Sequence, residues 1–134
     1  MVFVRRAGGQ SQFSAQLAAQ TAERAPLREL QSWIVEHPDA SLDVPAMARR
    51  AAMSVRHFGR LFRAQVGVPP AAWVERVRVE TARRLLETTS RGIEDVAEAA
   101  GFGTPESLRR AFGRRLGLSP REYRARFGAQ GGVT

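Results

Sequence analysis

Residues 101–127 read GFGTPESLRRAFGRRLGLSPREYRARF, and this stretch decides the fold. Thr104 suits a helix N-cap, and Pro105 suits the first helical position, where its missing N–H is not needed. Gly117 is typical of a glycine helix stop, and residues 119–122, SPRE, form a capping box. The apolar residues between cap and stop recur at helical spacing: Leu108, Ala111, Phe112 and Leu116. The stretch therefore predicts a helix, a stop and the start of a second helix.

The same pattern occurs 50 residues earlier in the chain. Caps, core positions, glycine stops and one outward arginine all recur at this one offset. The matched pairs are Ser54 and Thr104, Phe58 and Leu108, Arg60 and Arg110, Phe62 and Phe112, Gly67 and Gly117, Pro70 and Pro120, Trp73 and Tyr123, and Arg76 and Arg126. Because chance seldom gives such agreement, the chain carries one helical unit twice, as a pair of modules rather than a solenoid.

Hydrophobic periodicity along the remaining chain predicts an all-α fold with two helix-turn-helix units. The expected helices cover residues 26–37, 43–52, 54–66, 70–88, 93–101, 104–116 and 119–127. We expect residues 26–88 to form the first unit together with a long central helix, and residues 89–127 to form the second. That central helix would be about 28 Å long. Its expected buried stripe is Trp73, Val77, Ala82, Leu85 and Leu86.

The two ends of the sequence differ in character from the helical part. Residues 2–4, VFV, resemble a short strand, and a Gly- and Gln-containing stretch follows. A lone strand cannot satisfy its own edges, so we expect residues 1–25 to be a linker that carries the end of an upstream domain. A frayed N-terminus is the alternative. Residues 128–134 are expected to be a disordered tail.

Charge favours a polyanionic partner. The net charge is +8, all 21 basic residues are arginine, and the whole excess lies in residues 43–134, with 17 arginines against 9 acidic residues. A localised excess of this kind is typical of nucleic-acid binding, although a solvated basic surface is the open alternative. There is no cysteine, no apolar run near 18 residues and no signal-peptide pattern. We therefore expect a cytoplasmic protein with no membrane span.

Catalytic chemistry finds little support in these residues. His37 and His57 are isolated in the sequence, cysteine is absent, and neither a P-loop nor a dinucleotide-binding glycine motif occurs. We therefore expect no enzyme activity, no metal site and no cofactor.

DNA binding accounts for these features together. A helix-turn-helix unit places the N-terminal half of its second helix in the major groove, where Arg60 and Arg110 can each reach guanine O6 and N7. The alternative for both is a partly buried arginine paired with an acid. Arginines and helix N-termini would contact phosphates, and for Arg114, Arg115 and Arg121 plain solvation is the alternative. The phosphate-contact set is Ser54, Arg63, Thr104, Arg114 and Arg121.

Residues 43–127 resemble the DNA-binding domain of AraC/XylS transcription regulators. The resemblance is carried by Met47-Ala48, residues 54–62 (SVRHFGRLF), Gly67, Pro70, Arg78-Val79, residues 82–86 (ARRLL), Val96-Ala97, Gly101-Phe102, Phe112, residues 117–120 (GLSP) and Tyr123-Arg124. It implies seven helices, two helix-turn-helix units joined by the central helix, and one DNA site read through two successive major-groove segments.

The resemblance also places base-reading positions. They fall at Arg56, Gly59, Arg60, Glu106, Ser107, Arg109 and Arg110. Gly59 departs from the family, whose members often have a larger polar side chain there, so the first unit is expected to read fewer bases. Pro105 and Glu106 depart from a run of neutral polar residues. Glu106 either accepts from cytosine N4 or complements the helix dipole.

Residues 2–13 resemble the junction found in AraC-type regulators whose upstream domain is amidotransferase-like. This resemblance implies that effector sensing, and dimerisation if any, belong to an upstream domain. We therefore expect a sequence-specific, double-stranded-DNA-binding part of a bacterial-type transcription regulator, with RNA polymerase as a further partner. The alternative is a basic helical module that binds an acidic protein.

Overall fold

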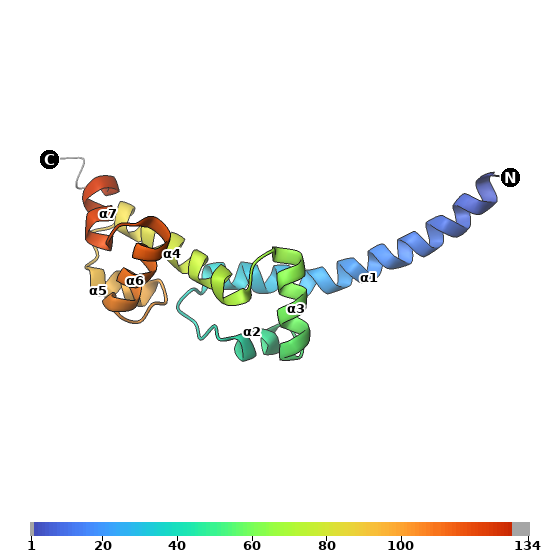
Figure 1. The fold of residues 1–134 in the computed structure, drawn as a ribbon, viewed down its shortest axis with the longest axis horizontal. Helices are drawn as coiled ribbons and strands as arrows, with labels where there is room; N and C mark the ends of the chain where they lie inside the picture. Colours follow the sequence, from blue (N-terminus) through green and yellow to red (C-terminus); the bar gives the residue numbers. More distant parts are fainter. Residues whose placement is uncertain (1, 130–134) are drawn as a thin grey trace.

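The chain consists of helices throughout the part that the structure describes. A computed structural model describes residues 2–129, with side chains described at 14–18 and 24–129. Within residues 2–129 there are seven α-helices and no strand (Figure 1). They are α1 (Val2–Glu36), α2 (Val44–Arg50), α3 (Val55–Val66), α4 (Pro70–Thr88), α5 (Ile93–Ala99), α6 (Pro105–Leu116) and α7 (Pro120–Phe127). The all-α prediction is confirmed, and α2 to α7 begin and end within two residues of their predicted bounds.

Side-chain caps start four of these helices. Asp43, Ser54, Thr104 and Ser119 each accept a hydrogen bond from a backbone N–H three residues later, over 2.8–3.2 Å. Glu122 completes the capping box by accepting from the N–H of Ser119 at 2.8 Å. A cap satisfies a backbone donor that the helix itself cannot pair. The starts of α2, α3, α6 and α7 are therefore set by local sequence, as predicted.

Left-handed residues end the helices of both units. Gly67 (φ 92°) ends α3 and Gly117 (φ 69°) ends α6, which confirms the predicted glycine stops. The short helices α2 and α5 are each followed by a residue of the same conformation, Ala52 (φ 57°) and Gly101 (φ 94°). The turns that lead to α3 and α6 therefore start from equivalent backbone geometry, although one contains alanine and the other glycine.

The hydrophobic core forms two clusters, one at each end of α4. The first consists of Leu27, Leu30, Ile34, Leu42, Met47, Ala48, Ala51, Phe58, Phe62 and Val74. The second consists of Val79, Ala82, Leu86, Val96, Ala97, Ala100, Leu108, Ala111, Phe112 and Tyr123. Figure 1 shows α2 and α3 beside one end of α4, and α5 to α7 around the other. The prediction of two units joined by a central helix is confirmed.

The buried face of α4 differs in part from the expected stripe. Ala82 and Leu86 are buried as predicted, but Val74 and Val79, which the stripe omitted, are buried as well. Val74 packs in the first cluster and Val79 in the second. These two residues lie about 140° apart around the helix axis. One stripe cannot describe α4, because the helix turns different faces toward the two cores.

The predicted strand at residues 2–4 and the predicted helix start at Pro26 are wrong. Residues 2–4 are helical rather than a strand, and α1 continues through the expected linker to Glu36, with Pro26 inside the helix instead of at its start. Most residues between Ser14 and Pro26 are alanine, glutamine, glutamate or arginine, which favour helix. An interior proline removes one backbone hydrogen bond and adds a steric clash, at a cost of about 3 kcal/mol, yet the helix continues through Pro26. In Figure 1 the N-terminal part of α1 extends away from the other helices.

The C-terminal boundary of the fold lies slightly beyond the predicted one. Gly128 was assigned to the tail, but it is buried. A Cβ atom there would lie 2.6 Å from the carbonyl oxygen of Arg124 and 3.3 Å from that of Leu86. The close approach of these backbones explains why glycine follows α7. The predicted tail at 130–134 lies outside the described residues.

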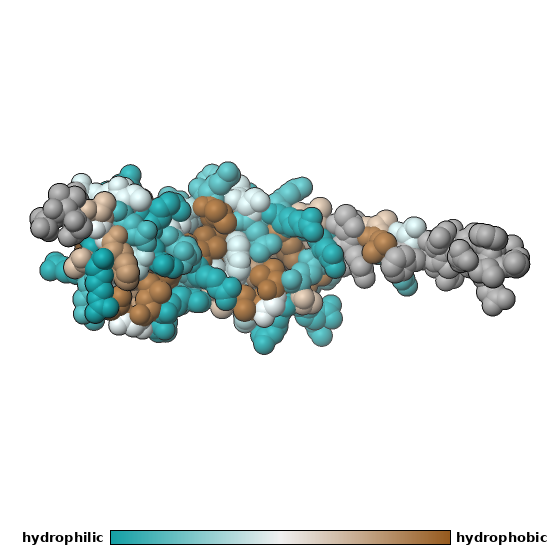
Figure 2. All heavy atoms as spheres, turned by 90° about the horizontal axis from the view of Figure 1, so that it is seen from above, coloured by the Kyte–Doolittle hydropathy of each residue, from teal (hydrophilic) through white to brown (hydrophobic). Residues whose placement is uncertain are grey.

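The surface is mixed in character. Figure 2 shows a face on which hydrophilic side chains surround separate hydrophobic patches. None of the helices in the described residues combines the length and the hydropathy that crossing a membrane requires.

Candidate DNA-binding surface

The outward face of α3 presents three arginines. Arg56, Arg60 and Arg63 are exposed, and within the described residues their side chains make no hydrogen bond or ion pair. The alternative of a buried, acid-paired Arg60 is therefore not the arrangement observed. Gly59 lies between them in the sequence, and a Cβ added there would meet nothing within 4 Å. This face is open and positively charged, but at Gly59 it has no side chain.

The corresponding face of α6 carries one unpaired arginine and one ion pair. Arg110 is exposed and, within the described part of the chain, has no side-chain partner. Glu106 Oε2 accepts from Arg109 Nη2 at 2.6 Å, and both side chains are more than half exposed. An exposed pair of this kind contributes about 0–1 kcal/mol. The Glu106–Arg109 ion pair can therefore open at little cost, which leaves both side chains able to contact bases.

Two of the predicted DNA contacts, Thr104 and Ser107, are joined to each other. Thr104 Oγ1 accepts from the Ser107 N–H at 3.2 Å, and the Thr104 hydroxyl donates to Ser107 Oγ at 3.2 Å. Ser54 Oγ accepts from the His57 N–H in the same way. These hydroxyl oxygens are occupied by capping, so the groups that the helix starts offer to a phosphate are mainly backbone N–H donors.

The arginines predicted to contact phosphate fall into two groups. Arg63 on α3 and Arg121 in the first turn of α7 are exposed and, among the described residues, unpaired. Arg114 is instead bonded within the protein, through Nη2 to Glu75 Oε2 at 2.7 Å. Its side chain is nevertheless 58% exposed. Arg114 can therefore face solvent while it is held by α4.

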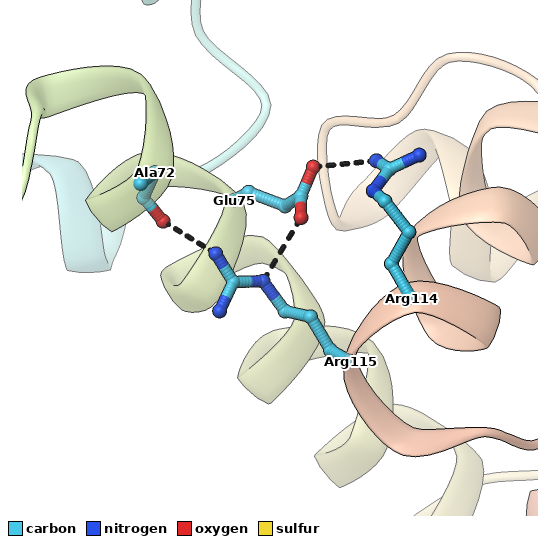
Figure 3. A network of polar contacts seen from close by, with 4 residues as sticks. All are labelled: Ala72, Glu75, Arg114 and Arg115. Atoms are coloured by element: carbon cyan, nitrogen blue, oxygen red, sulfur yellow. Dashed lines mark hydrogen bonds and ion pairs between the residues drawn. The ribbon is translucent and has the colours of Figure 1, made fainter.

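The side chain of Arg115 reaches from α6 to α4. Its Nε donates to Glu75 Oε1 at 2.9 Å and its Nη2 donates to the Ala72 carbonyl oxygen at 2.9 Å (Figure 3). The sequence predicts Arg115 as a solvated or phosphate-contacting residue, and it gives no sign of the partner Glu75. No local signal could reveal this pair, because its members are 40 residues apart in the sequence.

The electrostatics of Glu75 follow from these contacts. Partial burial of its carboxyl opposes ionisation, but hydrogen bonds from Arg114 and Arg115 outweigh burial and lower the pKa of Glu75 below its ordinary value. The carboxylate is therefore charged at neutral pH and shares its charge between two guanidinium groups.

A cleft of about 420 Å³ lies between α4 and α6. Its lining includes Glu75, Arg78, Ser107, Arg110 and Arg114. Ser107, Arg110 and Arg114 follow one another at helical spacing, so they belong to one face of α6. The unpaired Arg110 thus stands at the edge of the same cleft whose wall contains the Glu75 pairs.

Comparisons with known proteins agree with this geometry. Residues 47–126 match the family described as "Helix-turn-helix domain". The HTH-type transcriptional regulator Rv1931c of Mycobacterium tuberculosis is 52% identical over 81 residues, which cover 60% of this chain and 31% of that protein. The HTH-type transcriptional regulator GlxA of Rhizobium meliloti is 38% identical over 95 residues, covering 71% of this chain and 28% of that protein. The chain spans about a third of the length of such curated relatives.

Solved structures show the same fold. The DNA-binding domain of AdpA, a global transcriptional factor crystallised with a target DNA, has a TM-score of 0.74 at 44% identity. The match covers 78% of this chain and 95% of that one. A transcriptional regulator from Chromobacterium violaceum, with an AraC-type DNA-binding domain, has a TM-score of 0.71 at 26% identity, covering 81% of this chain and 97% of that one.

Two helix-turn-helix units on one central helix, each with exposed arginines on its second helix, define a DNA-binding domain of a transcription regulator. The match over residues 47–126 places the chain more narrowly: it belongs to the AraC-type helix-turn-helix family. The relatives reported above are named as transcriptional regulators.

Proposed function

We propose that this chain reads one double-stranded DNA site through two successive major-groove segments, with α3 and α6 as the recognition helices. The observation that carries the proposal is the pair Arg60 and Arg110. Each lies on the second helix of its unit, is exposed, and within the described residues has no intramolecular partner. An arginine so placed can donate two hydrogen bonds to guanine, for about 1–3 kcal/mol of discrimination.

The other exposed side chains divide between base and phosphate contacts. Arg56 in the first unit, and Glu106, Ser107 and Arg109 in the second, extend the base-reading faces. Gly59 leaves a gap, so the first unit reads fewer bases than the second. The phosphate contacts come from Arg63, Arg114 and Arg121 and from the helix starts at Ser54 and Thr104.

The relatives support the wider setting of this proposal. The DNA-binding domain of AdpA, 44% identical with a TM-score of 0.74, was crystallised with a target DNA. We infer that the chain is the DNA-binding part of a longer bacterial-type regulator that acts in the cytoplasm and contacts RNA polymerase. Effector sensing and any dimerisation belong to an upstream domain, for which an amidotransferase-like fold is the candidate.

Selection of bound duplexes from a random library tests the proposal. We expect an enriched site with two conserved blocks about one helical turn, roughly 34 Å, apart. Affinity for that site should fall steeply with salt, because several phosphates are neutralised. Enrichment of no sequence, together with equal affinity for any polyanion, would contradict sequence reading and favour the alternative of an acidic protein partner.

A further inference from the structure

The two units have separate cores, so something other than a shared core must fix their relative orientation. α4 connects them, but a helix of 19 residues can bend. α6 packs in the second cluster, whereas Val74 in the N-terminal half of α4 belongs to the first. Contacts between α6 and that half of α4 therefore bear directly on how the two recognition helices stand relative to each other.

Hydrogen bonds of this kind join four residues, which we call the Glu75 cluster: Ala72, Glu75, Arg114 and Arg115. Figure 3 shows both arginines reaching from α6 toward Glu75, with Arg115 also bonded to the Ala72 carbonyl. The other two ion pairs in the described part of the chain each lie within a single helix. Ion pairing between helices is thus found, among the described residues, only where the first-unit half of α4 meets α6.

Within the Glu75 cluster, the Glu75–Arg115 pair is better shielded than the two ion pairs that lie within single helices. The side chains of Glu75 and Arg115 are each 27% exposed, against 56% and 62% for Glu106 and Arg109. Charge-assisted hydrogen bonds that are partly shielded from water are stronger than fully exposed ones. Because Arg115 donates from two different nitrogens to two acceptors one turn apart on α4, it restrains rotation as well as distance.

A second close contact lies between the units. Gly101, in the turn before α6, lies so near the loop after α1 that a Cβ would be 2.0 Å from the Pro38 carbonyl oxygen. The same Cβ would be 2.6 Å from Arg78 Nε, which itself donates to Pro38 O at 2.9 Å. The turn before α6 therefore lies directly against the first unit, and the far end of α6 is bonded to α4.

We propose that the Glu75 cluster sets the spacing between the two blocks of DNA that the chain reads, with Glu75 as a positioning residue. The inference rests on the proposed function, in which α3 and α6 each read one block. Inserting one base pair moves the second block by about 3.4 Å and by about a tenth of a helical turn. While α6 is restrained at both of its ends, the two recognition helices cannot follow that movement. If the contacts of the Glu75 cluster are lost, the two units can reorient and follow it.

The first test compares Glu75→Gln with Glu80→Gln on a panel of duplexes. The panel holds the two selected blocks at their native spacing and at spacings one and two base pairs shorter or longer. Glu80→Gln is the matched control, because it removes the same charge from α4 but breaks only the pair with Arg83 within that helix. Each variant loses one negative charge, so the general electrostatic effect on DNA affinity is the same in both and cancels when the two are compared.

We expect the wild-type chain and Glu80→Gln to lose about tenfold or more in affinity for a one-base-pair change, within the range that a mismatched base pair costs. Glu75→Gln should reduce that loss to about threefold or less while it keeps the same preferred bases in each block. Arg115→Gln, which leaves the Glu75–Arg114 pair in place, should give the same relaxation and serves if Glu75→Gln folds poorly.

The second test measures the units without DNA. The chain has no cysteine, so Gln65→Cys on α3 and Glu98→Cys on α5 give two exposed sites for spin labels. Pulsed dipolar spectroscopy should give a narrow distance distribution in the wild-type and Glu80→Gln backgrounds and a broader one with Glu75→Gln.

Each failure has its own signature. An unchanged distance distribution in Glu75→Gln overturns the claim that Glu75 holds the units together. A broadened distribution with an unchanged spacing preference overturns the claim that it sets the DNA spacing. A wild-type chain that selects no two-block site contradicts the proposed function instead, and the label distances then still show whether the units are held.

Discussion

Arg110 and Arg114 lie one turn apart on α6, yet their surroundings differ. Arg110 is exposed and, among the described residues, has no side-chain partner, whereas Arg114 shares the carboxylate of Glu75. The sequence predicts Arg110 as a base-reading residue and Arg114 as a phosphate contact, but it does not reveal that Glu75 holds Arg114. The helix starts, by contrast, were predictable residue by residue, because each cap bonds to a backbone N–H only three positions away.

This difference predicts different effects on DNA binding. Arg110→Ala should remove discrimination at one base position, by about 1–3 kcal/mol, because a bidentate contact to one guanine is lost. Arg114→Ala should weaken all sequences alike, because a phosphate contact carries no base information. The measurement is affinity of both variants across every single-base change in the selected site. Equal loss over the whole panel for both variants would contradict the assignment.

The Glu75 carboxylate makes the stability of the fold dependent on pH. Its pKa is lowered in the folded chain, because hydrogen bonds from Arg114 and Arg115 outweigh the effect of burial. Its stabilising contribution is therefore complete above the ordinary carboxyl pKa of 4.5 and is lost as the pH falls through the lower folded value.

Urea unfolding of the wild-type chain and of Glu75→Gln at pH 7, 5, 4 and 3 measures this contribution. The wild-type chain should be the more stable at neutral pH, and the difference should shrink below about pH 4.5 as the carboxylate is protonated. A difference in unfolding free energy that stays constant down to pH 3 would show that the ionised form of Glu75 contributes nothing.

At the scale of elements, the turns after the two short helices, α2 and α5, have the same backbone geometry but different residues. Ala52 after α2 and Gly101 after α5 both have left-handed backbones. The N–H two residues beyond each C-cap closes an equivalent turn, from Met53 to Ala48 O at 2.9 Å and from Phe102 to Ala97 O at 2.8 Å. Alanine is strained in this conformation and glycine is not. Only Gly101, however, is pressed against another part of the chain.

Opposite substitutions at these two positions should therefore have opposite effects. Ala52→Gly should stabilise the fold by about 0.5 kcal/mol, because relief of left-handed strain exceeds the extra entropy of glycine in the unfolded chain. Gly101→Ala should destabilise it by about 2 kcal/mol or more, because strain and overlap with Pro38 add. Denaturant unfolding of both variants checks the pair. A Gly101→Ala chain as stable as the wild type would refute the close contact between the units.

Among the elements, α1 differs most from its predicted extent. Three apolar residues at 2–4 suggested a strand, and Pro26 suggested a helix start. A strand needs a partner, which those residues lack within the described chain, whereas an interior proline costs a helix only one hydrogen bond and some strain. The predicted bounds of helix 70–88 agree with those of α4. Its two buried faces were not predicted, because they depend on how each unit packs against the helix.

At the scale of the whole molecule, repetition made the architecture predictable. One offset aligned caps, stops and core residues, so two units and a connecting helix followed from the sequence alone. Their relative placement did not follow, because it depends on contacts between residues about 40 positions apart, such as those of Glu75 with Arg114 and Arg115. The candidate site was accordingly predictable as two arginine-bearing helix faces. The contacts that fix the position of one face relative to the other are evident only from the three-dimensional structure.

In the proposed function, each unit reads its own block of one DNA site. The most direct test is a base-substitution panel across the selected site with Arg60→Ala and Arg110→Ala. We predict that each variant loses discrimination at one position, that the two positions lie in different blocks, and that they are separated by about one helical turn. Loss at the same block for both variants, or at no position for either, would contradict the account.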